Sequence, residues 1–131
     1  MIVVDTNVVA YLYLPGEHTS RAEALLARDP EWVAPMLWRS EFRNIVAGFM
    51  RRGALTFDQA RRIVAEAESL LTGGEFDVDS SGVLELVHAS DCSAYDCEFV
   101  ALAMHLAVRL ATMDRKILVA FPRHTERLPA G

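Results

Sequence analysis

The chain has 131 residues, of which 52% are hydrophobic and 24% charged, and its formal net charge is −5 at pH 7. This balance is typical of one globular domain with its own core, here residues 1–131, and it excludes a disordered or fibrous protein. The acidic total excludes a broad basic surface for nucleic acid, so any nucleic-acid site has to be local.

The sequence begins without a recognisable export or membrane signal. Asp5 interrupts the apolar run at residues 1–4 long before a signal peptide or a membrane span could form. Cys92 and Cys97 have a spacing that fits neither a CxxC redox motif nor a paired zinc framework. We therefore expect both cysteines to be small buried side chains. We also expect a cytoplasmic protein that does not associate with a membrane.

Apolar periodicity, capping pairs and Gly or Pro breakers divide the chain into alternating strands and helices. Ser20 with Glu23, and Thr56 with Gln59, are typical of helix N-termini. Gly53 stands where a helix C-cap belongs, and the tail after Pro122 has no clear pattern. The predicted elements are strand 1–4, helix 8–14, helix 20–28, strand 32–34, helix 35–52, helix 57–72, edge strand 75–78, helix 80–90, helix 93–109, strand 110–113 and helix 115–121.

The alternation of strands and helices predicts the fold class. It indicates an α/β protein, a three-layer α/β/α sandwich around a mainly parallel central sheet. Ligands of such folds bind beyond the carboxyl ends of the strands. Acidic residues at those ends are therefore the first candidates for a functional site.

Asp5 and Asp114 each follow a predicted strand and precede a predicted helix. Both are therefore expected at the same functional edge of the sheet. An aspartate in this position can equally be a simple helix N-cap, and for each residue taken alone this alternative stays open.

Asp96 falls in the middle of an apolar helical stripe that includes Phe99, Val100 and Ala103. A carboxylate that faces the core needs a partner. Ser93 and Asp96 also resemble a capping box, in which the acid would serve only the helix N-terminus.

Glu41 lies on the flank of another apolar stripe, formed by Trp38, Phe42, Ile45 and Phe49. It too borders the predicted core. The alternative is a solvated side chain, or one that pairs with Arg39 or Arg52.

The four acids indicate a functional site when they are taken as a set, because this topology would bring Asp5, Glu41, Asp96 and Asp114 to one edge of the sheet. Clustered like charges need compensation, and Mg²⁺ or Mn²⁺ is the natural ion for ligands that are all oxygen. The scattered residues His18, His88, His105 and His124 do not indicate zinc.

The chain resembles a PIN-domain protein of the VapC toxin family, from Met1 to about Pro122. The matching segments are Val3-Val4-Asp5-Thr6-Asn7, Leu37-Trp38-Arg39-Ser40-Glu41-Phe42-Arg43-Asn44, Ser93-Ala94-Tyr95-Asp96 followed by Phe99-Val100-Ala101-Leu102-Ala103, and Ala111-Thr112-Met113-Asp114-Arg115-Lys116. Each motif alone is weak, whereas their order and spacing together are specific.

The resemblance implies that Asp5, Glu41, Asp96 and Asp114 are the metal-binding catalytic quartet, with Thr112 or Asn7 orienting carboxylates behind it. It also implies a Mg²⁺- or Mn²⁺-dependent endoribonuclease that forms a homodimer and is inhibited by a cognate antitoxin.

Cations near the expected cleft are candidates for RNA contact. They are Arg39, Arg43 and Arg115, together with Lys116.

Other protein classes fit the sequence less well. A haloacid-dehalogenase-like phosphatase needs a second aspartate where Asn7 stands, and a receiver domain needs acids ahead of Asp5. A non-catalytic PIN-like interaction module remains as the alternative.

Overall fold

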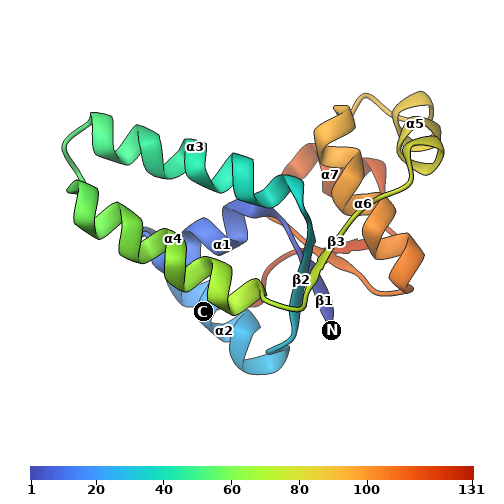
Figure 1. The fold of residues 1–131 in the computed structure, drawn as a ribbon. Coiled ribbons are helices and arrows are strands. Elements are labelled where there is room, and N and C mark those ends of the chain that lie inside the picture. The colour runs from blue at the N-terminus through green and yellow to red at the C-terminus, as the bar shows by residue number, and fades with distance from the viewer.

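The core of the protein is a parallel sheet of five short strands, in the order β3-β2-β1-β4-β5 (Figure 1). The computed structural model describes all residues from 1 to 131. The strands are β1 Ile2–Val4, β2 Trp32–Pro35, β3 Glu75–Phe76, β4 Leu110–Ala111 and β5 Thr125–Glu126. Because every strand runs in the same direction, all five carboxyl ends lie along one edge.

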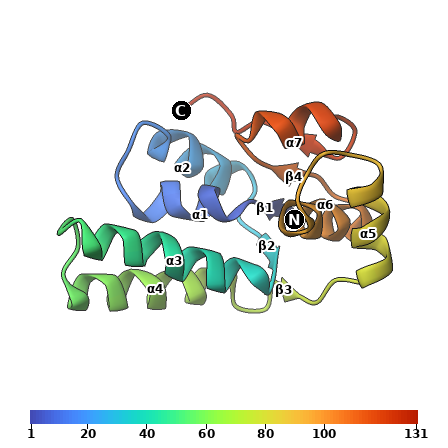
Figure 2. The ribbon, with the colours of Figure 1, turned by 90° about the horizontal axis from the view of Figure 1, so that it is seen from above.

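Seven helices cover the sheet and complete the predicted three-layer α/β/α sandwich. Figure 2 shows α1 to α4 on one side of the strands and α5, α6 and α7 on the other. The helices are α1 Thr6–Tyr13, α2 Thr19–Arg28, α3 Leu37–Arg51, α4 Phe57–Leu71, α5 Ser80–His88, α6 Ala94–Leu106 and α7 Arg115–Ala120. None of them combines the length and the apolar composition needed to span a membrane.

Burial explains why β1 and α6 form the centre of the molecule. All three residues of β1 are buried, which is typical of a strand covered on both faces of a parallel sheet. Helix α6 packs across β1, β2 and β4 and buries Phe99, Val100 and Leu102. Both cysteines are buried and unpaired, as the sequence predicts.

The helix signals were right at α4 and wrong at α2. Thr56 and Gln59 form the predicted reciprocal capping box. Ser20, in contrast, is not a cap, because α2 begins at Thr19 and His18 occupies the N-cap position without a side-chain bond. The turn before α2 is instead fixed by the Thr19 hydroxyl, which accepts from the Gly16 amide and donates to the Leu14 carbonyl.

Two features of the C-terminal quarter were missed by the sequence analysis. The polar residues of β5 have no strand pattern, yet they pair with β4 in the register Leu110 to Thr125. Helix α6 ends at Leu106, three residues earlier than expected, because Ala107 adopts the left-handed conformation with φ of 55°. No glycine marks this stop.

Ala107→Gly should raise the free energy of unfolding by about 0.5–1 kcal/mol. The left-handed conformation costs an L-residue about 1–2 kcal/mol, and glycine avoids this cost. The greater conformational freedom of glycine in the unfolded chain cancels about 0.4–1 kcal/mol of the gain. Denaturant titration measures the difference. Ala107→Val is the matched control and should be less stable than wild type, because a β-branched residue is strained there; a destabilised glycine variant would contradict the prediction.

Candidate functional site

Asp5 follows β1 directly and lies at the carboxyl edge of the central strand. It stands at the N-cap position of α1, but its side chain makes no capping hydrogen bond. Its Oδ2 instead accepts a bond of 2.7 Å from the Thr112 hydroxyl, which comes from the end of β4. The Thr112 bond thus ties the Asp5 side chain to the end of β4.

Thr112 connects the two aspartates at the strand ends. It is fully buried, and its oxygen also accepts the backbone amide of Asp114 at 3.0 Å. One carboxylate oxygen of Asp114 accepts from the Ile117 amide at 3.2 Å and caps α7, and its role as a metal ligand stays a prediction. The same side chain is close enough to Asp5 and Asp96 to act on both electrostatically.

Glu41 is oriented by a residue that the sequence analysis did not single out. Thr6, buried in the first turn of α1, donates a bond of 2.7 Å to the Oε1 of Glu41 on α3. Neither arginine considered as a partner pairs with Glu41: Arg39 bonds Glu75, and Arg52 stacks on Phe49. The available signal was the position of Thr6 immediately after Asp5 in the motif.

Asp96 lies in the first turn of α6, half-buried beside the other acids. The Ser93 hydroxyl accepts its backbone amide at 3.1 Å, so the capping interaction expected from the sequence exists. Here the serine caps the helix through its own side chain. The Asp96 carboxylate also interacts electrostatically with Asp5, Glu41 and Asp114.

The pKa values of Asp5, Glu41 and Asp96 are raised, mainly by burial and in part by the charges of neighbouring acids. Burial raises the pKa of the Asp5 carboxyl, and the nearby charges of Asp96 and Asp114 raise it further against the lowering effect of the Thr112 bond. Burial also raises the pKa of Glu41, which additionally faces Asp5, Asp96 and Glu98. Burial raises the pKa of Asp96, hydrogen bonds from Ser93 lower it, and the charge of Asp114 raises it against the opposing charge of Lys116.

The donor chemistry of this cluster fits a hydrated divalent cation. All four side chains offer oxygen, the donor that Mg²⁺ and Mn²⁺ prefer. In this arrangement no three Asp, Glu, His or Cys side chains converge tightly enough to hold one ion by themselves. Mg²⁺ usually keeps several waters and binds through one or two carboxylates, so the looser arrangement suits it. The assignment of the quartet as metal ligands stays a prediction.

The cations proposed for RNA contact differ in whether acidic side chains of the protein already pair with them. Arg39 makes a two-bond pair with Glu75, at 2.6 and 2.8 Å, and also approaches Glu68 at 3.4 Å. Arg43 lies 3.7 Å from the same Glu68. Arg115 makes no ion pair; with Lys116 it lines a groove of about 580 Å³ that also includes Asp91. Asn7 is exposed, and its predicted orienting role is untested like theirs.

Comparison with known proteins identifies the family of this chain. The model of the PIN domain matches residues 2–122. The chain belongs to the PIN domain family. Within that family it is a VapC homologue, since Ribonuclease VapC3 from Pyrobaculum aerophilum is 30% identical over 126 residues, covering 92% of this chain and 95% of the relative.

Solved structures show the same PIN fold at lower identity. A crystal structure of a Pyrobaculum aerophilum protein has a TM-score of 0.77 at 16% identity, over 97% of this chain and 90% of the other. A toxin–antitoxin complex from Klebsiella pneumoniae has a TM-score of 0.73 at 16% identity, over 96% of each chain. The PIN fold predicted from the sequence is therefore confirmed.

The metal-free PIN protein should lose stability as pH rises through the range between the ordinary and the raised pKa of these carboxyls. Asp5, Glu41 and Asp96 all have raised pKa values, chiefly through burial, so the folded state holds protons that the unfolded state releases. Thermal melting in EDTA from mild acid to neutral pH measures this contribution.

A matched pair of variants assigns the effect to the cluster. Asp96→Asn should flatten the fall in melting temperature between mild acid and neutral pH, whereas Asp58→Asn, an exposed acid on α4, should keep it. Mg²⁺ at one hundred times its dissociation constant should add about 2.7 kcal/mol of stability to wild type. An unchanged pH profile and Mg²⁺ response in Asp96→Asn would leave Asp96 with a capping role alone.

Proposed function

We propose that the protein is a metal-dependent endoribonuclease and the toxin component of a toxin–antitoxin pair. The observation that carries this proposal is the meeting of Asp5, Glu41, Asp96 and Asp114 at one edge of the sheet, with two buried threonines bonded to two of them. The activity named for the VapC relative, and the toxin–antitoxin complex among the structural neighbours, support it.

The chain's own contribution to hydrolysis would be to hold carboxylate oxygens in place. Asp5 and Asp96 would hold Mg²⁺ or Mn²⁺ most directly, with Glu41 and Asp114 bound directly or through water. Such an ion supplies positive charge for the scissile phosphate and lowers the pKa of a bound water. Thr112 and Thr6 each fix one carboxylate oxygen, which leaves the other oxygen of Asp5 and of Glu41 for the site.

The proposed partners follow from the proposed activity of a toxin ribonuclease. RNA is the substrate, a cognate antitoxin covers the acidic cleft with a basic side chain, and the toxin is a homodimer in the cytoplasm. A non-catalytic PIN-like interaction module is the alternative, and it requires no metal-dependent cleavage.

Asp5→Asn and Asp96→Asn should each reduce Mg²⁺- or Mn²⁺-dependent RNA cleavage by at least about a hundredfold, because each change removes a negative charge at nearly constant volume. Cleavage of a mixed RNA pool by purified protein, read on a sequencing gel, is the measurement. EDTA added to wild type should give the same loss.

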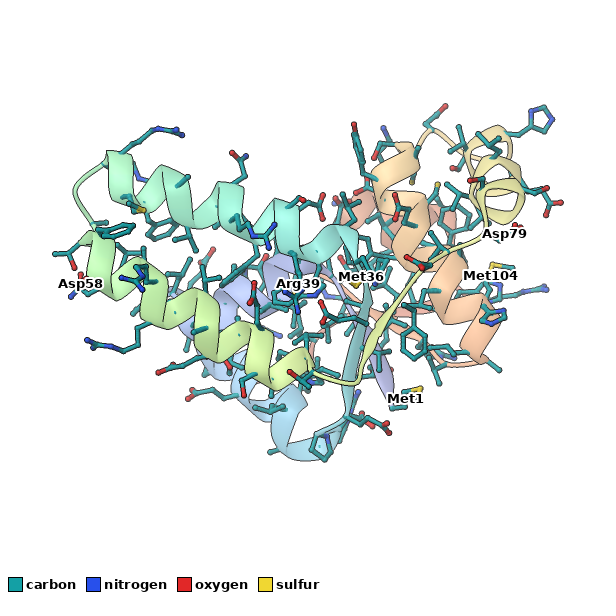
Figure 3. All side chains as sticks on the ribbon, in the orientation of Figure 1. Met1, Met36, Arg39, Asp58, Asp79 and Met104 are labelled. Carbon is teal, nitrogen blue, oxygen red and sulfur yellow. The ribbon has the colours of Figure 1, made fainter.

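Asp58→Asn is the matched control for charge removal. Figure 3 shows Asp58 at the end of the α3–α4 hairpin that is far from the sheet, so its loss should leave cleavage unchanged. Undiminished cleavage in both site variants would remove the proposed mechanism. Absence of cleavage in wild type with either metal would favour the interaction module.

Expression of wild type alone should slow growth of the native host after deletion of the antitoxin gene, and Asp96→Asn should not. The physical reason is that an unrestrained ribonuclease depletes cellular RNA, whereas the variant lacks one of the charges proposed to hold the ion. Growth curves with and without the antitoxin gene measure the effect. Equal, harmless behaviour of both proteins at matched levels would contradict the toxin assignment.

A further inference from the structure

We propose that Arg52, at the C-terminal end of α3, binds a phosphate of the RNA substrate some way along the strand from the scissile one, so that the RNA lies along the face of α3 that carries Glu41. The inference rests on the proposed ribonuclease function and extends it to the way in which the substrate is held. Arg52 is not among the cations that the sequence suggests for RNA contact.

The helical register places Arg52 on the same face of α3 as Glu41. Helix α3 begins where β2 ends and runs away from the sheet (Figure 1). Residues 41 and 52 are separated by about three full turns of an α-helix, so their side chains leave the helix in nearly the same direction. Gly48 lies between them on this face. The face therefore leads from the acidic edge of the sheet to Arg52.

The side chain of Arg52 lies back along this face toward Glu41. Gly48 has no side chain, and a Cβ atom at this position would come within 3.3 Å of the Nη1 of Arg52. The guanidinium carbon also lies 4.5 Å from the centre of the Phe49 ring, a cation–π contact that favours this position. Gly48 and Phe49 both belong to the turn before Arg52. The guanidinium is therefore directed toward the catalytic edge and not beyond the end of the helix.

The charge of Arg52 is available to a ligand. The residue is exposed, and no ion pair of the protein includes it. Residues 51–62 carry four arginines against the single acid Asp58, although the whole chain has a net charge of −5. This end of the α3–α4 hairpin is therefore a local positive surface on an acidic protein. Such a surface attracts the phosphate backbone of a nucleic acid.

The distance along α3 decides which phosphate Arg52 can reach. At a rise of about 1.5 Å per residue, Gly48 is about 10 Å from Glu41 along the helix axis. A guanidinium that lies over Gly48 is therefore placed for a phosphate farther along the strand than the one that is cleaved. Arginine suits this task because its planar group can donate two parallel bonds to phosphate.

The dipole of α3 does not account for the position of this side chain. A cation at the C-terminal end of a helix stabilises the helix through its dipole, and Arg51 in the last turn already supplies one. The Arg52 guanidinium lies over the preceding turn instead, against Gly48 and Phe49. A separate role for its charge is therefore needed.

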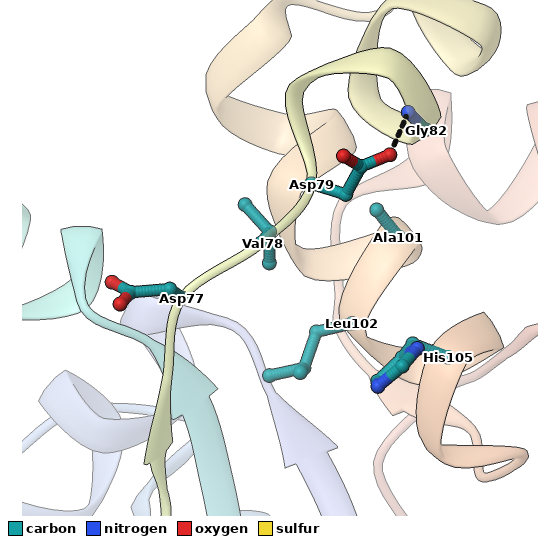
Figure 4. A pocket seen from close by; sticks show the side chains of 7 residues that line it. All are labelled: Asp77, Val78, Asp79, Gly82, Ala101, Leu102 and His105. Atoms are coloured by element: carbon teal, nitrogen blue, oxygen red, sulfur yellow. Dashed lines mark hydrogen bonds between the residues drawn. The ribbon is translucent and has the colours of Figure 1, made fainter.

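The cavity between α5 and α6 does not offer a comparable site for RNA. It has a volume of about 330 Å³, and its ionisable residues are Asp77, Asp79 and His105, without an arginine or a lysine. Figure 4 shows that Asp79 is occupied as the cap of α5, where it accepts from the Gly82 amide at 3.0 Å. Two acids in such a cavity repel phosphate.

Binding of RNA tests the inference without relying on cleavage. In the Asp96→Asn background with Mg²⁺, fluorescence anisotropy measures the binding of a short, labelled single-stranded RNA of mixed sequence. Adding Arg52→Ala should weaken binding about tenfold, as expected for the loss of a charge-assisted hydrogen bond. The slope of log Kd against log salt concentration should fall by about 0.7, the value for one phosphate contact of a single strand. Arg52→Lys should weaken binding less, because lysine keeps the charge.

Arg51→Ala is the matched control for the loss of one positive charge. Arg51 is also exposed and free of ion pairs, but its side chain leaves α3 about 100° away from that of Arg52. A charge that makes no contact is screened by salt, so this variant should weaken binding by about twofold at most. Thermal melting of the variants checks that each one is folded.

Each result decides the inference separately from the proposed function. A loss of RNA binding specific to Arg52 supports the inference even if wild type fails to cleave RNA. Unchanged binding in Arg52→Ala, an equal loss in Arg51→Ala, or no measurable RNA binding by the Asp96→Asn protein overturns it even if wild type cleaves. A poly-glutamate peptide probes the other possible occupant. If Arg52→Ala abolishes peptide binding and leaves RNA binding intact, this face takes an acidic protein segment, and the inference fails.

Discussion

The burial of several carboxylates beside one another is the constraint on which the site of this PIN domain depends. The carboxyl edge of a parallel sheet brings Asp5, Glu41 and Asp96 together, and burial first, then the charges of neighbouring acids, makes each carboxyl harder to ionise. Hydroxyl donors, and the charge of Lys116 acting on Asp96, offset part of this cost. Thr112 and Thr6 donate to two of the acids from buried positions, while Arg39 is bonded to Glu75 outside the cluster. The site therefore keeps a net negative charge that an ion can neutralise.

The same organisation explains how an acidic protein can act on RNA. Its exposed cations near the site are few, and two of those proposed for RNA contact are engaged by Glu75 and Glu68. Arg115 and Lys116 follow Asp114 directly in the chain, and no ion pair of the protein engages them. Positive charge that no acid of the protein pairs with is therefore present next to Asp114.

The sequence predicted the fold and the positions of the four acids because both depend on local patterns. Buried β-branched strands and capped amphipathic helices are visible as periodicity, and each acid stands at a strand end or on an apolar stripe. It could not predict Thr6 as the partner of Glu41, since that bond depends on how α1 packs against α3. The two-residue β5 and the left-handed Ala107 were missed because tertiary pairing, rather than residue preference, determines them. The orienting roles of Asn7 and Thr112, and the RNA contacts, remain predictions.

Because β1 lies in the middle of the sheet, the acidic site of the nuclease can be completed only late in synthesis of the chain. β1 is synthesised first, but one of its neighbours, β4, comes from residues 110–111, and the bond between Asp5 and Thr112 spans 107 positions of chain. A contact so distant in sequence cannot form before both of its residues have been synthesised. A ribosome that is still translating this message therefore carries a nascent chain whose acidic edge is incomplete. The translation machinery is exposed to the assembled site only after nearly the whole protein has been made.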